Sequence, residues 1–483
     1  GTFCTFLNQT ILATAFPTLM KYFSISASTV QWLTTGFLMV NGIMIPISSW
    51  LMGRFNSKLL YQSAMIIFFI GTLTCYLAQN FSTLFIGRLI QAVGVGVTMP
   101  LMQTLMLTIF PANRRGEAMG LAGLVIGLAP AIGPTLSGWI IDNYRWQTLF
   151  GMILPIVAVV IGASIWLMHS LLPLKSEKLD WLSALWSTIG FGGLLYGFSE
   201  VGEKGWGDKI VWLAIIIGII FIILFGKRQL HLDKPFLELR VLQNPEFSIA
   251  TLLSSVTMIA LVGVEMVVPL YLQSVRGESA FESGLTLLPG ALMMGIMSPI
   301  TGRIFDRIGA KRLAITGMFL LTTATIPFAF VTKSTPHLYV IFFYALRMFG
   351  IAMALMPVTT SGMNALPLKL MGDGTAVNNT IRQVASSMGT AIMISILTNV
   401  TKQAEPAQHL LKTQPLAYKN QMIAAVVSGY HAAFWVTILF CLLGLIVAFF
   451  VSGRIPHSIK ITTAAGTESA QWVFLLSLFQ PGW

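Results

Sequence analysis

Long apolar runs, separated by short polar segments, recur along the whole chain. Each run is close to the 20 or so residues that a bilayer-spanning helix needs, and none shows the alternation of a barrel strand. The pattern therefore predicts an all-α integral membrane protein with fourteen transmembrane helices. The expected spans are 4–20, 30–52, 59–78, 84–110, 118–141, 146–169, 181–198, 210–226, 248–273, 283–304, 313–331, 337–365, 375–400 and 430–452.

The composition excludes a soluble protein. Of the 483 residues, 55% are apolar and 10% are charged, whereas soluble domains carry about 25% charged residues. Fourteen spans would use about 280 residues, which leaves no room for a sizeable soluble domain. The three cysteines, Cys4, Cys75 and Cys441, lie inside apolar runs, so neither a disulfide framework nor a metal site is expected.

The net charge of +12 could indicate nucleic acid as a partner, but no basic run with interleaved aromatic residues occurs. Membrane topology explains the charge better. Loops on the side of the termini hold 17 of the 29 Lys and Arg residues and the opposite loops hold nine. The positive-inside rule then places the protein in the cytoplasmic membrane as a multi-pass protein with both termini in the cytoplasm.

Residues 1–170 and 248–452 form a weak internal repeat. In each half a basic loop follows the second span, and two spans later an intramembrane arginine, Arg88 or Arg347, precedes glycines and a proline. We expect six-helix bundles at 1–170 and 248–455, with two inserted helices and a cytoplasmic linker at 171–247. Transporters with repeated halves often alternate access to a site at the bilayer midplane.

Two segments lie outside this scheme. Residues 462–483 are polar and then briefly apolar, too short to span, and are interpreted as an added tail or a peripheral segment. Residues 401–429 form the longest connection on the outer side, and the sequence leaves open whether it is a helix or a loop.

Two motifs carry more specific information. The loop motif after the tenth span contains an acid that can cap or pair at a helix end; its residues are Gly302, Asp306, Arg307, Gly309, Lys311 and Arg312. A plain positive-inside loop is the alternative interpretation. The first-half copy has Gly53 in place of the acid and Asn56 in place of a glycine, so a locking role is better supported in the second half.

The fifth span contains small residues and prolines on one helical face, namely Gly123, Gly127, Pro130, Pro134 and Gly138, with Gly133 between them. Small residues let helices approach closely in lipid, and prolines remove backbone hydrogen bonds and bend the helix. Two interpretations of this face are open: a seam where two helices pack closely, or a motif with a role in transport.

These motifs, together with the segments 7–11, 87–91, 144–150 and 379–383, closely resemble the fourteen-helix drug:proton antiporter branch of the major facilitator superfamily, the QacA, EmrB and LmrB type. The resemblance covers most of residues 1–455. It implies the major facilitator fold and export of chemically varied drugs coupled to inward proton flow, with no enzymatic activity and no cofactor besides protons as the coupling ion. Many relatives carry an aspartate where this chain has Asn8, so its proton carrier must lie elsewhere.

Glu265 is the one acid predicted deep inside a span. A charged carboxylate there costs about 2.5 to 3.5 kcal/mol on insertion scales, so Glu265 should be protonated, paired or facing water. We predict a role in proton coupling or cation binding, against the alternative of a structural partner for an arginine or a polar helix. By resemblance Arg88 is part of a motif linked to proton coupling. The alternative is a structural role in which Arg88 forms hydrogen bonds with helix ends or with Gln91. Asp142, at the outer rim, is either a solvated acid or a proton entry point.

Arg347 and Arg382 are expected to be helix-end anchors or interior structural cations. For substrate binding we predict polar or adaptable side chains near the midplane of both halves, namely Asn8, Thr34, Asn41, Gln103, Glu265, Met294 and Asn378. The expected partners are small-molecule drugs, protons and the lipid bilayer. No nucleotide-binding loop of the P-loop type occurs. A proton-coupled carrier of a metabolite or lipid-like compound is the alternative function, and the oligomeric state stays open.

Overall fold

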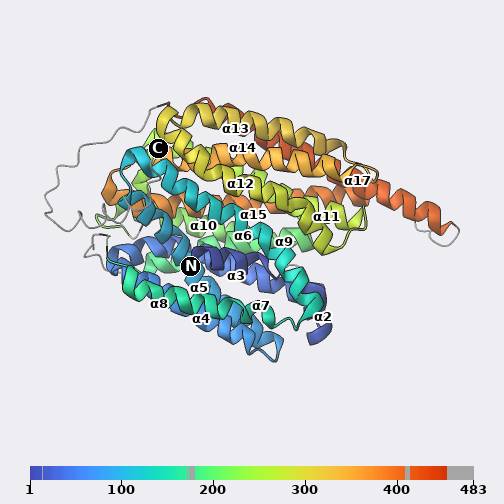
Figure 1. The fold of residues 1–483 in the computed structure, drawn as a ribbon, viewed down its shortest axis with the longest axis horizontal. Helices are drawn as coiled ribbons and strands as arrows, with labels where there is room; N and C mark the ends of the chain where they lie inside the picture. Colours follow the sequence, from blue (N-terminus) through green and yellow to red (C-terminus); the bar gives the residue numbers. More distant parts are fainter. Residues whose placement is uncertain (13–14, 171, 173–179, 236, 408–413, 454–483) are drawn as a thin grey trace, which may run out of the picture.

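The structure is a computed structural model that describes residues 1–12, 15–170, 172, 180–235, 237–407 and 414–453. Every regular element in these ranges is a helix, and the long helices run side by side along one direction (Figure 1). The tail at 462–483 lies outside the described residues. We name as the basic end the end of the bundle that contains the α3–α4 and α12–α13 turns, where Arg54 and Arg307 lie.

Within the described residues the first part of the chain forms eight helices; most lie in the lower half of Figure 1, and α6 runs through its middle. They are α1 (Thr2–Thr10), α2 (Phe16–Phe23), α3 (Ala27–Arg54), α4 (Ser57–Tyr76), α5 (Phe81–Ile109), α6 (Arg115–Asn143), α7 (Thr148–Gly151) and α8 (Ile153–Leu167). Two further helices follow, α9 (Trp181–Lys204) and α10 (Lys209–His231). They pack on each other, and α9 also packs on α3 and α15.

The last part of the chain forms the upper half of Figure 1. Its helices are α11 (Pro245–Ser274), α12 (Ala280–Ile308), α13 (Ala310–Thr325), α14 (His337–Asn364), α15 (Met371–Gln403) and α17 (Pro415–Ala448). Short 3₁₀ segments occur at Ala112–Arg114, Leu239–Gln243, Ile326–Phe330 and Leu368–Leu370.

Local sequence explains where several helices begin. Ser279 caps α12 by accepting a hydrogen bond from Glu282 N, and the Glu282 carboxylate bonds back to Ser279 N, which is a capping box. Asn244 caps α11 directly before Pro245, a residue that suits the first helical position because it lacks an N–H. The turn from α12 to α13 passes through Gly309 at φ +80°, a conformation that favours glycine.

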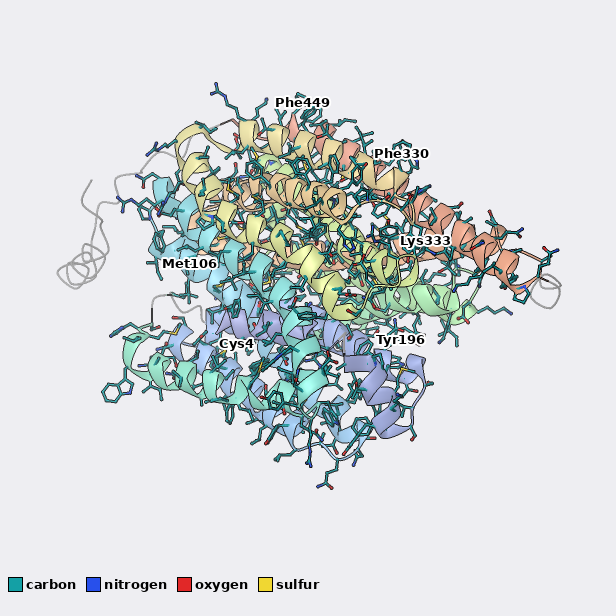
Figure 2. The ribbon with its side chains drawn as sticks, turned by 45° about the vertical axis from the view of Figure 1, so that its right-hand side comes forward. Cys4, Met106, Tyr196, Phe330, Lys333 and Phe449 are labelled. Atoms are coloured by element: carbon teal, nitrogen blue, oxygen red, sulfur yellow. The ribbon has the colours of Figure 1, made fainter. Side chains whose placement is uncertain are left out.

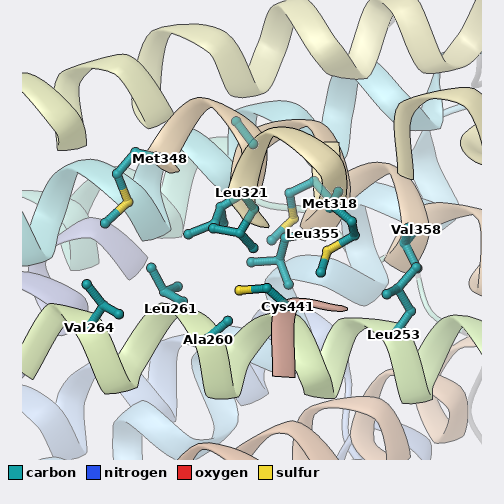
Figure 3. Packing of buried hydrophobic residues seen from close by; sticks show 14 of the residues in the cluster. Leu253, Ala260, Leu261, Val264, Met318, Leu321, Met348, Leu355, Val358 and Cys441 are labelled. Carbon is teal, nitrogen blue, oxygen red and sulfur yellow. The ribbon is translucent and has the colours of Figure 1, made fainter. Parts of the chain in front are cut away.

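The two largest of four apolar cores in the described residues lie mainly in the two parts of the bundle. One consists of residues between 4 and 157, including Phe37, Phe68 and Cys75. In the other, α11 contributes Leu253 and Ala260, and side chains of α13, α14 and α17 meet them around Cys441 (Figure 3). All three cysteines are free and buried.

The expected spans agree with the helices to within a few residues in most cases, and eleven helices in the described residues are long and apolar enough to cross a membrane. The other three expected spans fall on α1 with α2, on α6 and on α9, so the number fourteen stays a prediction. The boundaries at 170 and 247 also stay predictions.

Two expected spans differ from the helices in the structure. The first is present as two helices, α1 ending at Thr10 and α2 beginning at Phe16, and Pro17, which has no N–H to continue a preceding helix, lies in the first turn of the second. The last was expected to begin at 430, but α17 begins at Pro415. The second half of the 401–429 connection is therefore helical.

Candidate functional site

The fifth-span motif forms the seam between α6 and α12, which is the most extensive helix pair in the molecule. A Cβ at Gly116 or Gly302 would collide with the backbone carbonyl of the other residue. Further along, a Cβ at Gly120 would lie 2.5 Å from Ser298 O, and one at Gly127 would lie 2.9 Å from Met294 Cγ. The backbones of α6 and α12 therefore contact each other directly across the seam, because glycine has no side chain to hold them apart.

Of the remaining motif positions, Gly133 faces α1 and Gly138 faces α12. A Cβ at Gly133 would collide with Thr10 Oγ1 of α1, and one at Gly138 would lie 3.8 Å from Phe281 Cβ of α12. Of Pro130 and Pro134, only the helical backbone is described. The packing-seam interpretation of this motif therefore has direct geometric support.

Asp306 closes this seam at the basic end. Its Oδ1 accepts a hydrogen bond from Gly116 N at 2.8 Å, and its Oδ2 accepts one from Glu117 N at 3.0 Å. These amides belong to the first turn of α6, where a negative charge is stabilising. Beside it, Arg303 forms an ion pair with Glu117 at 2.7 Å. The loop motif thus joins the two parts of the chain, while Arg307, Lys311 and Arg312 are exposed.

The seam between α3 and α15 is closed in a different way. Ser49 Oγ donates to Asp373 Oδ1 at 2.6 Å, and Glu238 N donates to the same oxygen at 3.3 Å. Asp373 lies in the first turn of α15. The acid is therefore on α15, opposite Ser49 of α3, and the linker after α10 contributes to the contact.

Arg88 is fully buried in a polar network within the first part of the chain. Its Nη1 donates to Gln91 Oε1 at 2.9 Å and to Asn8 O at 3.2 Å, and its guanidinium lies 4.2 Å from the Phe37 ring centroid. Asn8 Nδ2 donates to the same Gln91 oxygen at 3.0 Å. The predicted alternative, a bond to Gln91, is present, and Asn8 belongs to this network.

Glu265 lies on α11 and is partly exposed. Among the described residues it has no hydrogen bond and no ion pair. Arg347 acts on it electrostatically but donates instead to Thr325 Oγ1 at 3.1 Å and to the carbonyl of Ala260. The predicted structural alternative for Glu265, a close arginine partner, is thus not found within the part of the chain described.

Polar side chains of α5, α11 and α15 meet where the two parts of the chain join. Asn379 Nδ2 donates to Gln103 Oε1 at 2.7 Å, and Asn378 Nδ2 donates to Thr251 Oγ1 and Ser254 Oγ, both at 3.2 Å. Several buried atoms here have no partner in the described residues, namely Gln103 Nε2, Asn378 Oδ1, Arg382 Nε and Arg382 Nη1. Because such groups are costly when unpaired, they are candidates for contact with water or a transported molecule.

The predicted substrate residues therefore do not all meet. Gln103 and Asn378 lie in this junction, and Asn41 is buried on α3 with its carbonyl facing Gly96 of α5. Met294 packs in the α6–α12 seam, and Thr34 is half-buried on α3. The sequence analysis missed Asn379, although it is the neighbour of Asn378 in a polar run within a predicted span.

The other predicted residues are placed as follows. Asp142 is exposed at the end of α6 far from the basic end and forms no ion pair with a described residue. Arg347 and Arg382 lie inside α14 and α15 rather than at helix ends. Arg382 is buried, and its one polar contact among the described residues is with Met258 Sδ at 3.3 Å.

The inserted helices are fixed at the basic end by an ion pair outside the membrane-spanning core. Arg228 Nε bonds Asp180 Oδ2 at 2.6 Å, and this hydrogen bond lowers the pKa of the Asp180 carboxyl. Gln229 donates to Ser183 Oγ at 2.6 Å and accepts from Leu237 N at 3.0 Å. The insert is thereby tied to the linker that reaches Asp373.

Comparison with known proteins identifies the family. The sequence profile of the Major Facilitator Superfamily matches residues 1–390. The chain belongs to this superfamily, and it is a transporter and not an enzyme. The family expected from the motifs is thus confirmed.

Individual relatives agree. The uncharacterized MFS-type transporter YcnB of Bacillus subtilis is 47% identical over 450 residues, covering 93% of this chain and 92% of that protein. The lincomycin resistance protein LmrB of Listeria monocytogenes is 38% identical over 444 residues, covering 92% and 93%. The crystal structure of the human organic anion transporter MFSD10 (TETRAN) matches with a TM-score of 0.64 and 13% identity, covering 92% and 96%, which shows a shared fold.

Proposed function

We propose that this protein exports lipophilic or cationic drugs across the cytoplasmic membrane in exchange for protons, with the two helical bundles alternating access to a site between them. The similarity to a lincomycin resistance protein supports drug export. Glu265 carries the proposal of proton coupling, because it is an accessible acid inside a predicted span that forms no ion pair with a described residue. Such a group can exchange a proton without first breaking a salt bridge.

The same proposal assigns the basic end to the cytoplasm, following the distribution of Lys and Arg. In the described conformation the contacts of Asp306 and Asp373 close that end. Drug would enter after these contacts break and leave on the opposite side. The partly unpaired amides of Gln103 and Asn378 support a binding site at the junction of the two bundles.

The proton gradient is sufficient for such export. One proton moving down about 100 mV and one pH unit releases roughly 3.7 kcal/mol, enough for a concentration ratio of about 500 for a neutral drug. A monovalent cation exchanged for one proton moves no net charge, so the pH difference alone drives it, about tenfold per pH unit. The limiting concentration ratio therefore depends on the charge of the drug, and the test compares drugs of different charge.

The test uses liposomes that contain the protein and an internal pH dye. After a pH gradient is imposed, neutral, monocationic and dicationic drugs are added to wild type, Glu265→Gln and the control Glu405→Gln, whose side chain is exposed after the end of α15. We expect drug-evoked proton movement in wild type and the control, and its loss in Glu265→Gln. Movement retained in Glu265→Gln would place the proton carrier elsewhere. No movement in wild type with any drug would favour a metabolite carrier.

A further inference from the structure

A groove lies on the outer side of the second bundle, between α13, α14 and α17. Its volume is about 440 Å³, and its walls include Ile315, Phe319, Leu320, Met353, Leu445 and Phe449. Phe319 and Phe449 are 58% and 55% exposed, and Phe449 lies at the edge of the molecule away from the first bundle (Figure 2). The groove therefore faces lipid and lies apart from the proposed drug site.

The groove is almost entirely apolar. The one hydroxyl in its wall, Thr316 Oγ1, donates to Arg312 O at 2.8 Å within its own helix and so presents no free donor. Such a lining suits a hydrocarbon chain and offers nothing to orient a polar drug. The occupant must be recognised by polar groups elsewhere, at an end of the groove.

Two cationic side chains, Lys311 and Arg312, lie at the end of the groove nearest the basic end. Lys311 and Arg312 precede Ile315 and Thr316 by four residues, so they lie on the same face of α13 as the groove wall. Both are exposed and neither forms an ion pair with a described residue. They begin a helix whose N-terminus has no side-chain cap, so its amides add to the positive potential.

The dimensions fit one lipid chain. From Lys311 to Phe319 the helix rises about 12 Å, whereas one leaflet of the hydrocarbon core is about 15 Å thick. A headgroup at Lys311 and Arg312 would thus place its acyl chain along the groove. Basic pockets beside transmembrane helices on the cytoplasmic side bind acidic lipid headgroups, and each Lys or Arg near the membrane surface contributes about 1 kcal/mol.

We propose that this groove binds one acyl chain of an anionic phospholipid, with the phosphate held by Lys311 and Arg312. A lipophilic drug would use the apolar wall but not the cations. Charge complementarity therefore favours the lipid. The proposal is independent of drug export.

The test compares dioleoyl phosphatidylglycerol with dioleoyl phosphatidylcholine, which differ in headgroup charge but not in chains. Native mass spectrometry of the delipidated full-length protein measures how much of each lipid is retained. We expect wild type to prefer phosphatidylglycerol roughly tenfold, and Lys311→Gln/Arg312→Gln to lose the preference. The control Arg54→Gln/Lys58→Gln removes the same charge at the basic end of the first bundle and should keep it.

A second arm needs no variant. A photoactivatable phosphatidylglycerol in nanodiscs should crosslink to peptides of α13 and α17 in wild type, and excess phosphatidylglycerol should displace it. Equal retention of the two lipids by wild type, or an unchanged preference in the Lys311/Arg312 variant, would overturn the proposal. Displacement by a neutral lipophilic drug as efficient as by phosphatidylglycerol would assign the groove to drugs instead, and a dimer that masks the crosslink would assign it to a second copy.

Discussion

Asn8 occupies a position where a carboxylate would meet a guanidinium. Its Nδ2 and Arg88 Nη1 both donate to Gln91 Oε1, while Asn8 Oδ1 and Arg88 Nη2 are buried without a partner in the described residues. The network is neutral apart from the Arg88 charge. An acid at position 8 would therefore be placed beside an uncompensated cation, which stabilises the ionised carboxylate, so the acid would take up a proton only when it moves away from Arg88 during the transport cycle.

The substitution Asn8→Asp tests this environment. We expect the variant to carry a second proton per cycle, so that export of a monocationic drug moves net charge and becomes sensitive to membrane potential. At 100 mV the potential adds about 2.3 kcal/mol, or roughly 50-fold in the limiting concentration ratio. The measurement is drug export from liposomes in which a potassium diffusion potential is set with valinomycin.

Asn80→Asp is the matched control, because position 80 is the N-cap of α5 and either residue serves there. Wild type and this control should show no response of monocation export to the potential. If Asn8→Asp behaves as they do, the added carboxylate does not take part in coupling.

The helices that close the basic end do so through two unlike contacts. At the α6–α12 seam the acid, Asp306 of the loop motif, lies in the last turn of α12. At the α3–α15 seam the acid lies on α15 itself, and the linker after the insert shares it. Both seams are therefore closed at the same end of the bundle, but the acid comes from α12 in one seam and from α15 in the other.

Asp306→Asn should weaken the first closure. Asparagine keeps only one acceptor oxygen, so one of the two hydrogen bonds from the α6 amides is lost. A lost hydrogen bond costs about 0.5 to 1.5 kcal/mol, which shifts the balance between closed and open basic ends up to about tenfold toward open. Spin labels at the exposed positions Asn113 and Arg307 would report the separation of the two bundles by double electron–electron resonance. We expect a longer distance to gain population.

Asp142→Asn, at the far end of α6, is the control for this measurement and should leave the distance distribution unchanged. A distribution in Asp306→Asn identical to wild type would mean that the glycine contacts alone keep the seam closed.

Most helices could be predicted from sequence because bilayer thickness sets the length of an apolar run. The exceptions have local causes that hydropathy does not measure, such as the start of α17 in the polar segment at Pro415. The site was less accessible to prediction. The partners of Asp306 are amides almost 190 residues away in sequence, and backbone amides leave no mark in the sequence. Asn379 could have been found, since polar residues inside a span are functional candidates by default.

At the scale of the whole molecule, the distribution of Lys and Arg between the two ends of the bundle predicts how the protein is oriented in the membrane. Arg54, Arg307 and the end of α17 lie at one end of the bundle, and Lys333 lies at the other (Figure 2). The positive-inside rule assigns the first end to the cytoplasm.

A labelling experiment checks this assignment. Single cysteines at the exposed positions Arg54 and Lys333 are treated with a membrane-impermeant maleimide in right-side-out vesicles, where the three buried native cysteines should stay unreactive. We expect Lys333→Cys to be labelled at once and Arg54→Cys only after the vesicles are opened. The opposite pattern would invert the topology and with it the proposed direction of transport.

The length of α17 has a practical consequence. Its 34 residues extend about 51 Å, some 20 Å more than the hydrocarbon core, and its first turns project beyond the other helices (Figure 1). A protein of this size in a detergent micelle offers little outside the micelle for aligning particle images in electron cryomicroscopy. A small helical protein fused in register to the start of α17, so that one unbroken helix joins them, would supply a rigid fiducial on the side opposite the basic end.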